Sequence, residues 1–363
     1  MIIFIYGTTA EAIKIAPIAR RLAERGIAYQ QWLTLQHTTA LLQVLPTLGL
    51  EEPDLLIANG NNGEPLRSSK DVIRWLFQIW KWLRKNAKSL RSTLPSDTVI
   101  VVHGDTLTTV VGAYIAKRLK VDCAHVEAGL RSGNWRHPFP EELDRRIVGT
   151  MATIHYTPSL ESTENLSSKP NVVFTHGNTV IDAVLDQGDF ISEESEKFGV
   201  VLLHRFELIS NQQLLEQTIS TLATESPYPI KLMVDAYSEH ALTGAVAKFG
   251  LGTLTAQPKL RHQEFIGMIR RAQFIVTDSG GIQAEAALIG VPTLIHRKTT
   301  EQAEGLGRNI VLSEWKTERL TEFLKNSEGF RKHLQRPAHS PSDVIVDDLI
   351  ARGYAENGAE RKR

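Results

Sequence analysis

The sequence is poor in several features that mark particular classes of protein. Its 363 residues include one cysteine, Cys123, so no disulfide can form within the chain. Lysine plus arginine equals aspartate plus glutamate, at 41 each, and this balance provides no basic field for binding nucleic acid. The apolar run at residues 2–6 is too short for a membrane span, and no basic segment precedes it. We therefore expect a cytoplasmic protein without a membrane span.

Motifs of several common catalytic sites are also missing. The histidines are scattered, and neither H-E-x-x-H nor C-x-x-C occurs, so the sequence predicts no metal site. No serine nucleophile elbow of the form G-x-S-x-G is present. The turn after residues 2–6 lacks the fingerprint G-x-G-x-x-G. That turn is therefore either an anion site at a helix N-terminus or an ordinary tight turn.

What the sequence does contain is a repeated alternation of apolar strands and amphipathic helices. Runs typical of buried strands occur at residues 2–6, 29–35, 99–102, 122–126, 154–157, 172–176, 199–203, 228–234, 252–255, 274–277 and 291–295. Helical periodicity occurs between many of them, for example at residues 139–150, 211–224, 262–271 and 341–352. The alternation predicts an α/β protein with Rossmann-like domains at 1–175 and 176–350 and a tail at 351–363. We expect the ligand to bind in the cleft between the two domains.

Carboxylates follow two neighbouring strands of the first half. Asp105 lies in H-G-D-T after residues 99–102, and Glu127 follows residues 122–126. The stretch 126–146 then adds Glu141 and Glu142 among glycines, prolines and arginines. Carboxyl ends of parallel strands are where open α/β sheets bind ligands, and clustered carboxylates shift one another's pKa toward values useful for proton transfer. The alternative is a salt-bridged loop with Asp105 as a structural residue.

The second half has its own candidate site at the end of the strand 274–277. There the sequence reads Asp278-Ser279-Gly280-Gly281 and opens a helix that carries Glu285. Two glycines let a ligand approach the backbone, and a helix N-terminus favours a phosphate. Glu285 is placed to accept hydrogen bonds from a ribose diol. The alternative is a glycine turn required for close packing of helix on sheet.

Residues 70–92 predict a long helix with an apolar stripe and a strongly basic opposite face. The stripe consists of Val72, Trp75, Leu76, Ile79, Trp82 and Leu83. Such a helix either packs its tryptophans on the sheet with its lysines in water, or meets a membrane or an acidic partner through its basic face.

With these residues placed, the chain resembles the non-hydrolysing UDP-N-acetylglucosamine 2-epimerases from about residue 3 to about residue 315. The matching blocks are G-T-T-A-E-A-I-K-I-A-P, Gln36-His37, H-G-D-T, A-H-V-E-A-G-L-R-S, P-F-P-E-E-L-D-R-R, G-N-T-V-I-D-A, L-H-R-F-E, D-S-G-G-I-Q-A-E-A and R-K-T-T-E-Q. The resemblance implies a GT-B-like fold in which two Rossmann-like parallel-sheet domains face a central cleft.

The resemblance also implies roles for particular residues. The family's catalytic residues match Asp105, Glu127, Glu141 and His204. Its substrate-binding positions match Lys14, Arg131, Arg205, Ser279, Gly280, Gly281, Glu285 and Gln302. No metal or other cofactor is implied, because UDP itself is the leaving group and the nucleophile. Family members are typically homodimers that serve cell-surface polysaccharide biosynthesis, and bacterial relatives bind an activating UDP-GlcNAc at blocks matched by Gln36, His37 and Glu142.

The sequence departs from the family pattern where the diphosphate is expected. Thr9 and Ala10 stand in place of the Arg-Pro of G-T-R-P-E, and Gln302 and Ala303 replace those of T-E-R-P-E. The block H-R-R-E-N reads H-R-F-E-L here. Each lost contact to an ionised group removes roughly 1.5–3 kcal/mol unless another group compensates. The candidates for compensation are Arg131, Arg136, Arg205, Arg297 and Lys298.

The leading hypothesis is therefore a nucleotide-sugar 2-epimerase. It would interconvert UDP-GlcNAc and UDP-ManNAc, or a related UDP-2-acetamido sugar, by elimination and re-addition of UDP. Three alternatives stay open: a hydrolysing 2-epimerase that releases UDP, a GT-B glycosyltransferase, and a non-catalytic protein that binds a nucleotide-sugar.

Overall fold

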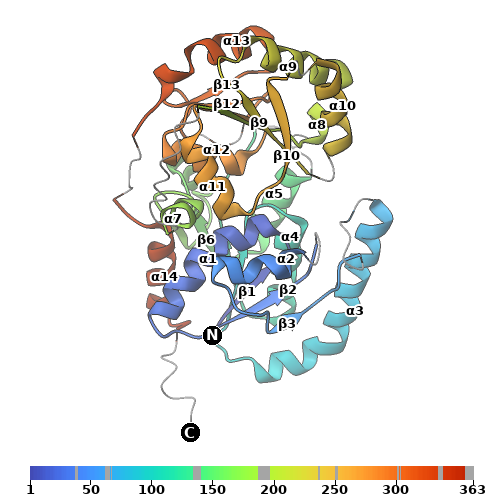
Figure 1. The fold of residues 1–363 in the computed structure, drawn as a ribbon. Helices are drawn as coiled ribbons and strands as arrows, with labels where there is room; N and C mark the ends of the chain where they lie inside the picture. Colours follow the sequence, from blue (N-terminus) through green and yellow to red (C-terminus); the bar gives the residue numbers. More distant parts are fainter. Residues whose placement is uncertain are drawn as a thin grey trace. The chain divides into compact units, whose positions relative to one another are not determined.

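A computed structural model describes residues 1–36, 40–61, 66, 68–133, 140–186, 197–235, 238–249, 252–300, 302, 304–333 and 338–355. The chain divides into two compact units. Unit 1 comprises Met1–Asp186 and Pro337–Arg363, and unit 2 comprises Gln187–Arg336. The sequence predicts a division at 175/176, with residues 341–350 in the second domain. In the structure, helix α14 (Pro341–Ala351) belongs to unit 1, because it packs on α1 (Thr9–Glu24), as Figure 1 shows.

Unit 1 is built on a seven-stranded parallel sheet with the order β3-β2-β1-β4-β5-β6-β7. Its strands are β1 (Ile2–Tyr6), β2 (Tyr29–Leu33), β3 (Leu55–Leu56), β4 (Val99–His103), β5 (Asp122–Val126), β6 (Ile154–Thr157) and β7 (Val172–Phe174). In register, Ile2 pairs with Tyr29 on one side and with Val99 on the other. Both faces are covered by helices, and this explains why β1 and β4 are buried throughout and, apart from His103 at the end of β4, apolar without alternation.

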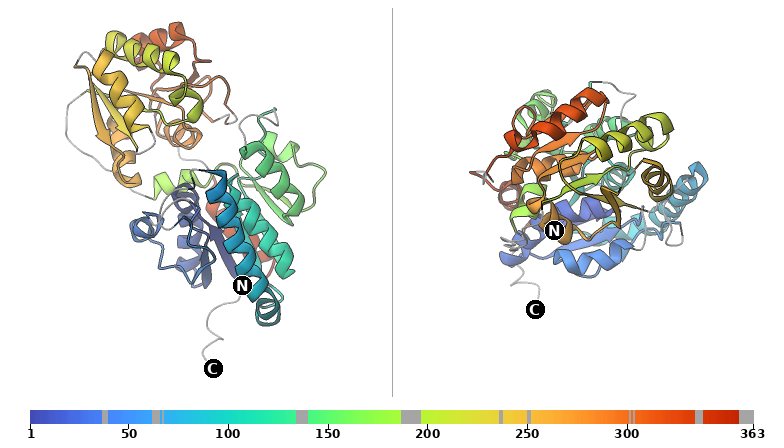
Figure 2. Two further views of the ribbon diagram at one scale, coloured as in Figure 1. Left: turned by 90° about the vertical axis from the view of Figure 1, so that its right-hand side faces the viewer. Right: turned by 45° about the horizontal axis from the view of Figure 1, so that its top comes forward.

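The side chains of β1 divide between two cores. Phe4 packs with α1 and α14 on one face, whereas Ile5 packs with α3 and α4 on the other. The helices of unit 1 besides α1 and α14 are α2 (Ala40–Val44), α3 (Ser69–Thr93), α4 (Leu107–Leu119), α5 (Glu141–Met151), α6 (Leu160–Glu164) and α7 (Val180–Leu185), with a 3₁₀ turn η1 at Leu45–Leu48. Figure 2 shows α3 lying along α4.

Unit 2 repeats the plan with a six-stranded parallel sheet in the order β10-β9-β8-β11-β12-β13. Its strands are β8 (Gly199–Leu202), β9 (Ile230–Val234), β10 (Leu254–Pro258), β11 (Phe274–Thr277), β12 (Thr293–Ile295) and β13 (Ile310–Leu312). Its helices are α8 (Phe206–Ile209), α9 (Gln212–Glu225), α10 (Glu239–Phe249), α11 (His262–Arg271), α12 (Gly280–Ile289) and α13 (Thr317–Asn326), with a 3₁₀ turn η2 at Ser327–Phe330. Glycine is required at 199, because a Cβ there would lie 2.3 Å from the Phe274 ring.

The strand order reverses at one place in each sheet, between β1 and β4 in unit 1 and between β8 and β11 in unit 2. Ligands of open α/β sheets bind outside the carboxyl ends of the strands at such a reversal. The fold therefore directs attention to the loops that follow these four strands.

The long helix predicted at 70–92 is α3. Trp75 is completely buried, and Ile79 and Leu83 are nearly so, which supports packing on the sheet. No helix in the described part of the chain is both long and apolar enough to cross a bilayer.

Candidate functional site

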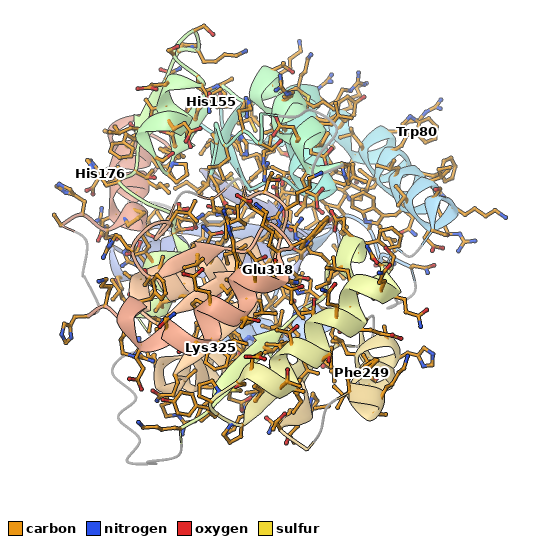
Figure 3. The ribbon with its side chains drawn as sticks, turned by 90° about the horizontal axis from the view of Figure 1, so that it is seen from above. Trp80, His155, His176, Phe249, Glu318 and Lys325 are labelled. Carbon is orange, nitrogen blue, oxygen red and sulfur yellow. The ribbon has the colours of Figure 1, made fainter. Side chains whose placement is uncertain are left out.

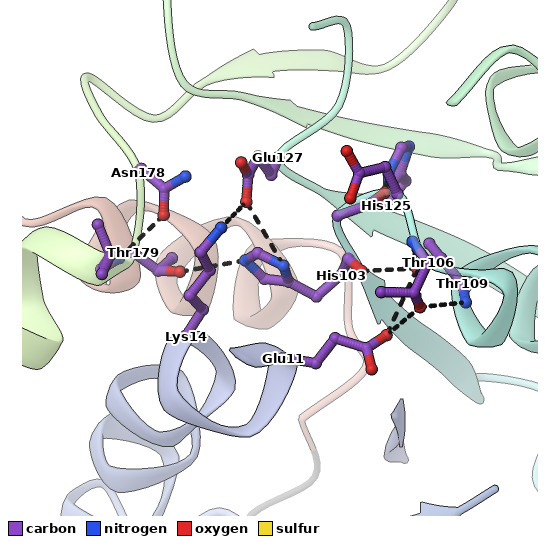
Figure 4. Close-up of polar contacts among 12 residues, drawn as sticks. Glu11, Lys14, His103, Thr106, Thr109, His125, Glu127, Asn178 and Thr179 are labelled. Carbon is purple, nitrogen blue, oxygen red and sulfur yellow. Dashed lines mark hydrogen bonds and ion pairs between the residues drawn. The ribbon is translucent and has the colours of Figure 1, made fainter. Parts of the chain in front are cut away.

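The loop after β1 is fastened by Glu11, in the first turn of α1. Its carboxylate accepts hydrogen bonds from the amides of Gly7 (3.0 Å) and Thr8 (2.9 Å) and from the hydroxyl of Thr106 (2.7 Å), as Figure 4 shows in part. Burial raises the pKa of Glu11, and these hydrogen bonds oppose that rise. Glu11 thus joins the β1–α1 loop to the residue after Asp105. The sequence analysis assigned it no role, although the capping-box pattern T-x-x-E identifies it.

Glu127, directly after β5, lies at the centre of a buried cluster. Its Oε2 atom lies 2.5 Å from Nζ of Lys14 and 3.6 Å from Nδ1 of His103, while Nε2 of His103 lies 3.3 Å from the Thr179 hydroxyl (Figure 4). Burial alone would raise the pKa of Glu127, but Lys14 and His103 lower it to about 2. The backbone of Glu127 has a φ of 66°, a left-handed conformation that is costly for a residue with a Cβ. The surroundings therefore hold an ionised carboxylate in a constrained position.

Asp105 lies beside this cluster, because Gly104 donates from its amide to the Val126 carbonyl (2.9 Å) and so ties the two strand ends together. Nη2 of Arg145, on α5, lies 2.5 Å from Oδ2 of Asp105. The Asp105 side chain is still 30% exposed, so it is held and also accessible within unit 1.

The first turn of α5 carries three further carboxylates. Glu142 is completely buried and accepts from the amide of Ser132 (3.1 Å), with Arg145 at 3.4 Å and Arg146 at 3.0 Å. Glu141 begins the helix and is half-buried.

Asp144, in the same turn, is a buried carboxyl group with little compensation from its neighbours. It is 4% exposed, and its buried Oδ2 atom has no hydrogen-bond partner among the described residues. Burial, followed by repulsion from Asp105 and Glu141, raises the pKa of Asp144 to about 7. Asp105 and Glu141 therefore lie within electrostatic range of a carboxyl group whose pKa is raised close to neutral pH.

In unit 2, Asp278 organises the ends of β8 and β11. It is almost completely buried and accepts hydrogen bonds from the amides of His204 (3.0 Å) and Arg205 (2.9 Å). Nδ1 of His204 lies 3.4 Å from Oδ1 of Asp278. Burial lowers the pKa of His204, and the Asp278 carboxylate opposes this shift. His204 and Arg205 are thereby fixed beside the turn that begins at Ser279.

The Ser279-Gly280-Gly281 turn leads directly into α12. The hydroxyl of Ser279 forms no capping bond to the helix. Among the described residues, a Cβ at Gly281 would meet only Oγ of Ser279, at 3.9 Å, so there is room beside this residue at the helix N-terminus. Such an end presents free N–H groups to an anion.

The replaced positions 9 and 302 lie in different units. Thr9 is half-buried at the start of α1, whereas Gln302 is buried and its carbonyl accepts from Nε2 of Gln283 on α12 (2.9 Å). Among the candidate cations, Arg297 is buried and is the second residue after β12, and Lys298 is exposed. Arg131 and Arg205 are half-buried, and burial lowers the pKa of Arg131. Arg136 and His37 lie outside the described residues.

The predicted site residues thus fall into two groups. Unit 1 holds Lys14, Asp105, Glu127, Arg131 and Glu141, and unit 2 holds His204, Arg205, Ser279, Gly280, Gly281, Glu285 and Gln302. Within the described residues, no group of three or more His, Cys, Asp or Glu side chains is arranged to hold a metal ion. The residues that sequence reasoning did not single out are Glu11, His103, Asp144, Arg145, His262 and Asp278.

Comparison with known proteins gives a consistent result. The family model for UDP-N-acetylglucosamine 2-epimerase matches residues 20–343. The UDP-N-acetylglucosamine 2-epimerase of Campylobacter jejuni is 30% identical over 340 residues, covering 85% of this chain and 84% of the relative. That of Bacillus subtilis is 32% identical over 326 residues, covering 83% and 80%.

A solved structure also matches. The UDP-GlcNAc 2-epimerase from Neisseria meningitidis, bound to UDP-GlcNAc, superimposes with a TM-score of 0.81 at 25% identity, covering 96% of this chain and 99% of that one. The likeness confirms the predicted fold class of two Rossmann-like parallel-sheet domains. This chain belongs to the UDP-N-acetylglucosamine 2-epimerase family.

Proposed function

We propose that the protein is a nucleotide-sugar 2-epimerase that interconverts UDP-GlcNAc and UDP-ManNAc or a related UDP-2-acetamido sugar. The observation that carries the proposal is the pair of constrained carboxylates, Asp105 and Glu127, at neighbouring strand ends in a chain of this family. A relative with 0.81 TM-score is itself bound to UDP-GlcNAc, which supports the choice of substrate class.

Unit 2 would bind the UDP moiety. The free N–H groups at the start of α12 suit the diphosphate, with the Ser279 hydroxyl as a further donor. Glu285, buried in the second turn of α12, would accept from the ribose hydroxyls. His204 and Arg205, both fixed by Asp278, would contact the phosphate and the sugar, and Gln302 lies beside α12 through Gln283.

Unit 1 would carry out the proton transfers. A base removes the proton at C2, the C1–O bond breaks, and its electron pair leaves with UDP, so that a 2-acetamidoglucal and UDP form. Return of a proton to the opposite face of C2 and re-addition of UDP to C1 gives the epimer. Asp105, Glu127 and Glu141 are the proposed catalytic carboxylates. Glu127 would be ionised in the resting enzyme, since Lys14 and His103 keep its pKa at about 2.

The loss of the family arginines at positions 9 and 302 calls for other cations beside the diphosphate. Arg205 and Arg297 are the best candidates for this role. Both lie shortly after a strand end of unit 2; Arg205 is half-buried and Arg297 is buried. Arg131, in unit 1, is the corresponding candidate on the sugar side.

We also propose that the protein forms a homodimer through the outer face of α3. Ile73, Phe77 and Trp80 are 66%, 58% and 49% exposed, and the rings of Phe77 and Trp80 stack at 5.5 Å. Figure 3 shows Trp80 at the outer side of its helix. Exposed apolar patches of this kind are typical of interfaces, and sedimentation equilibrium of the wild-type protein tests the proposal.

Incubation with UDP-GlcNAc in deuterium oxide, followed by NMR, tests the function. We expect UDP-ManNAc with deuterium at C2, and Asp105→Asn should lose turnover while it keeps UDP binding, because UDP is assigned to unit 2. A protein that exchanges the C2 proton of no UDP-2-acetamido sugar is not an epimerase. Free UDP that accumulates in step with ManNAc would instead identify the hydrolysing reaction.

A further inference from the structure

Glu285, the proposed ribose ligand, forms a buried pair with His262, a residue to which the proposed function gives no role. Nε2 of His262, the first residue of α11, lies 2.8 Å from Oε1 of Glu285 on α12. The two side chains are 9% and 8% exposed. When the carboxylate of Glu285 accepts this bond, the proton lies on Nε2 and His262 is the donor.

The pair lies at the same end of unit 2 as the Ser279-Gly280-Gly281 turn, the proposed diphosphate site. Helices α11 and α12 both begin at the carboxyl edge of the parallel sheet, after β10 and β11. Glu285 follows Gly281 by four residues, so both lie on one face of α12. Helical side chains point back toward the N-terminus, and the carboxylate of Glu285 therefore extends toward the Ser279-Gly280-Gly281 turn.

The bond from His262 leaves Glu285 with acceptor capacity to spare. A carboxylate has about four lone-pair positions, and His262 occupies one of them on Oε1. The remaining positions on the two oxygens suit a pair of neighbouring hydroxyls. A donor that fixes the carboxylate before binding reduces the conformational entropy lost when the ligand arrives.

We propose that His262 is a positioning residue that holds the Glu285 carboxylate to accept both hydroxyls of a ribose cis-diol. The pair selects a ribonucleotide over its 2′-deoxy analogue. This inference rests on the proposed function, because it takes Glu285 as the group that binds the ribose.

Calorimetric titration of UDP and 2′-deoxy-UDP into the wild-type protein, His262→Ala and His262→Gln tests the proposal. We expect the wild type to prefer UDP by about tenfold or more, since a site built for a hydroxyl is left with an unpaired group by the deoxy ligand. His262→Ala should weaken UDP by about tenfold and leave 2′-deoxy-UDP nearly unchanged. His262→Gln, which keeps an N–H donor at similar reach, should restore most of the preference.

The outcomes separate this role from the function. Equal weakening of both nucleotides in His262→Ala, without rescue by His262→Gln, overturns the positioning role and leaves the epimerase proposal in place. Unchanged UDP affinity in His262→Ala also overturns the positioning role and leaves the epimerase proposal in place. A wild-type protein that binds neither nucleotide overturns both. If His262→Ala does not fold, Glu285→Gln and His262→Phe, which keeps a ring but removes the N–H donor, carry the test, because both variants should reduce the ribose preference and the double variant should add nothing further.

Discussion

The strand ends that carry the predicted site residues differ between the two units in how they use charge. In unit 1, the loop residues form a crowded set of ion pairs, in which Lys14 faces Glu127 and Arg145 faces Asp105. In unit 2, the corresponding loops use mainly backbone: Asp278 accepts two amides, and the α12 N-terminus leaves its own amides open. Side-chain charges suit proton transfer because their pKa values can be tuned, whereas fixed N–H groups suit an anion that only has to be held. The difference supports our proposal that unit 1 carries the chemistry and unit 2 binds the nucleotide.

The strongest way to break this comparison is Glu127→Gln. It removes the charge and the proton-transfer capacity but keeps the size of the side chain. We expect kcat to fall by about 10²–10⁴ while the affinity for UDP changes little. Initial rates and calorimetry measure the two quantities, with Glu164→Gln, an exposed glutamate on α6, as the matched control. A comparable loss of UDP affinity would show that unit 1 also holds the nucleotide.

Gly281→Val tests the other half of the comparison. The added Cβ meets only Oγ of Ser279 among the described residues, at 3.9 Å, so we expect the unfolding midpoint to change little. It blocks the approach of a diphosphate to the α12 amides, and UDP affinity should fall about tenfold or more. Unchanged affinity would remove the nucleotide from this helix end.

The smallest expected effect concerns the pH dependence of stability in unit 1. The pKa of Asp144 is about 7 in the folded protein against 3.8 as its ordinary value. Between these values the folded state keeps the proton that the unfolded state releases, so rising pH destabilises the fold until about pH 7. Asp144→Asn removes this dependence. Its stability relative to wild type should therefore improve from pH 4 to pH 8, by on the order of 1 kcal/mol or more.

Urea unfolding at several pH values measures this slope. The slope is the informative quantity, since the cost of burying the new amide does not vary with pH. If the difference in the free energy of unfolding between variant and wild type is constant from pH 4 to pH 8, the pKa of Asp144 is not raised. The charged groups of unit 1 would then interact less strongly than we infer.

Much of the secondary structure could be predicted from the sequence, because it depends on local patterns. The strand at residues 2–6 and the helix at 262–271 agree with β1 and α11 residue for residue. Helices α10 and α13 and strand β13 were not predicted. Helix α10 carries Gly244 near its middle, a poor helix former that weakens the signal, and β13 has only three residues.

The sequence by itself therefore determined the two α/β halves, the family, and which carboxylates, glycines and histidines stand at strand ends, since each depends on local order along the chain. Only the tertiary structure decided which residues distant in the sequence come into contact. Lys14 reaches Glu127 across 113 positions, α14 returns to unit 1, and His262 finds Glu285 on a neighbouring helix. These pairings depend on strand order and helix packing. The pKa values of Glu127 and Asp144 depend on them too, because burial and neighbouring charges set a pKa. Neither burial nor neighbouring charge can be read from the local sequence.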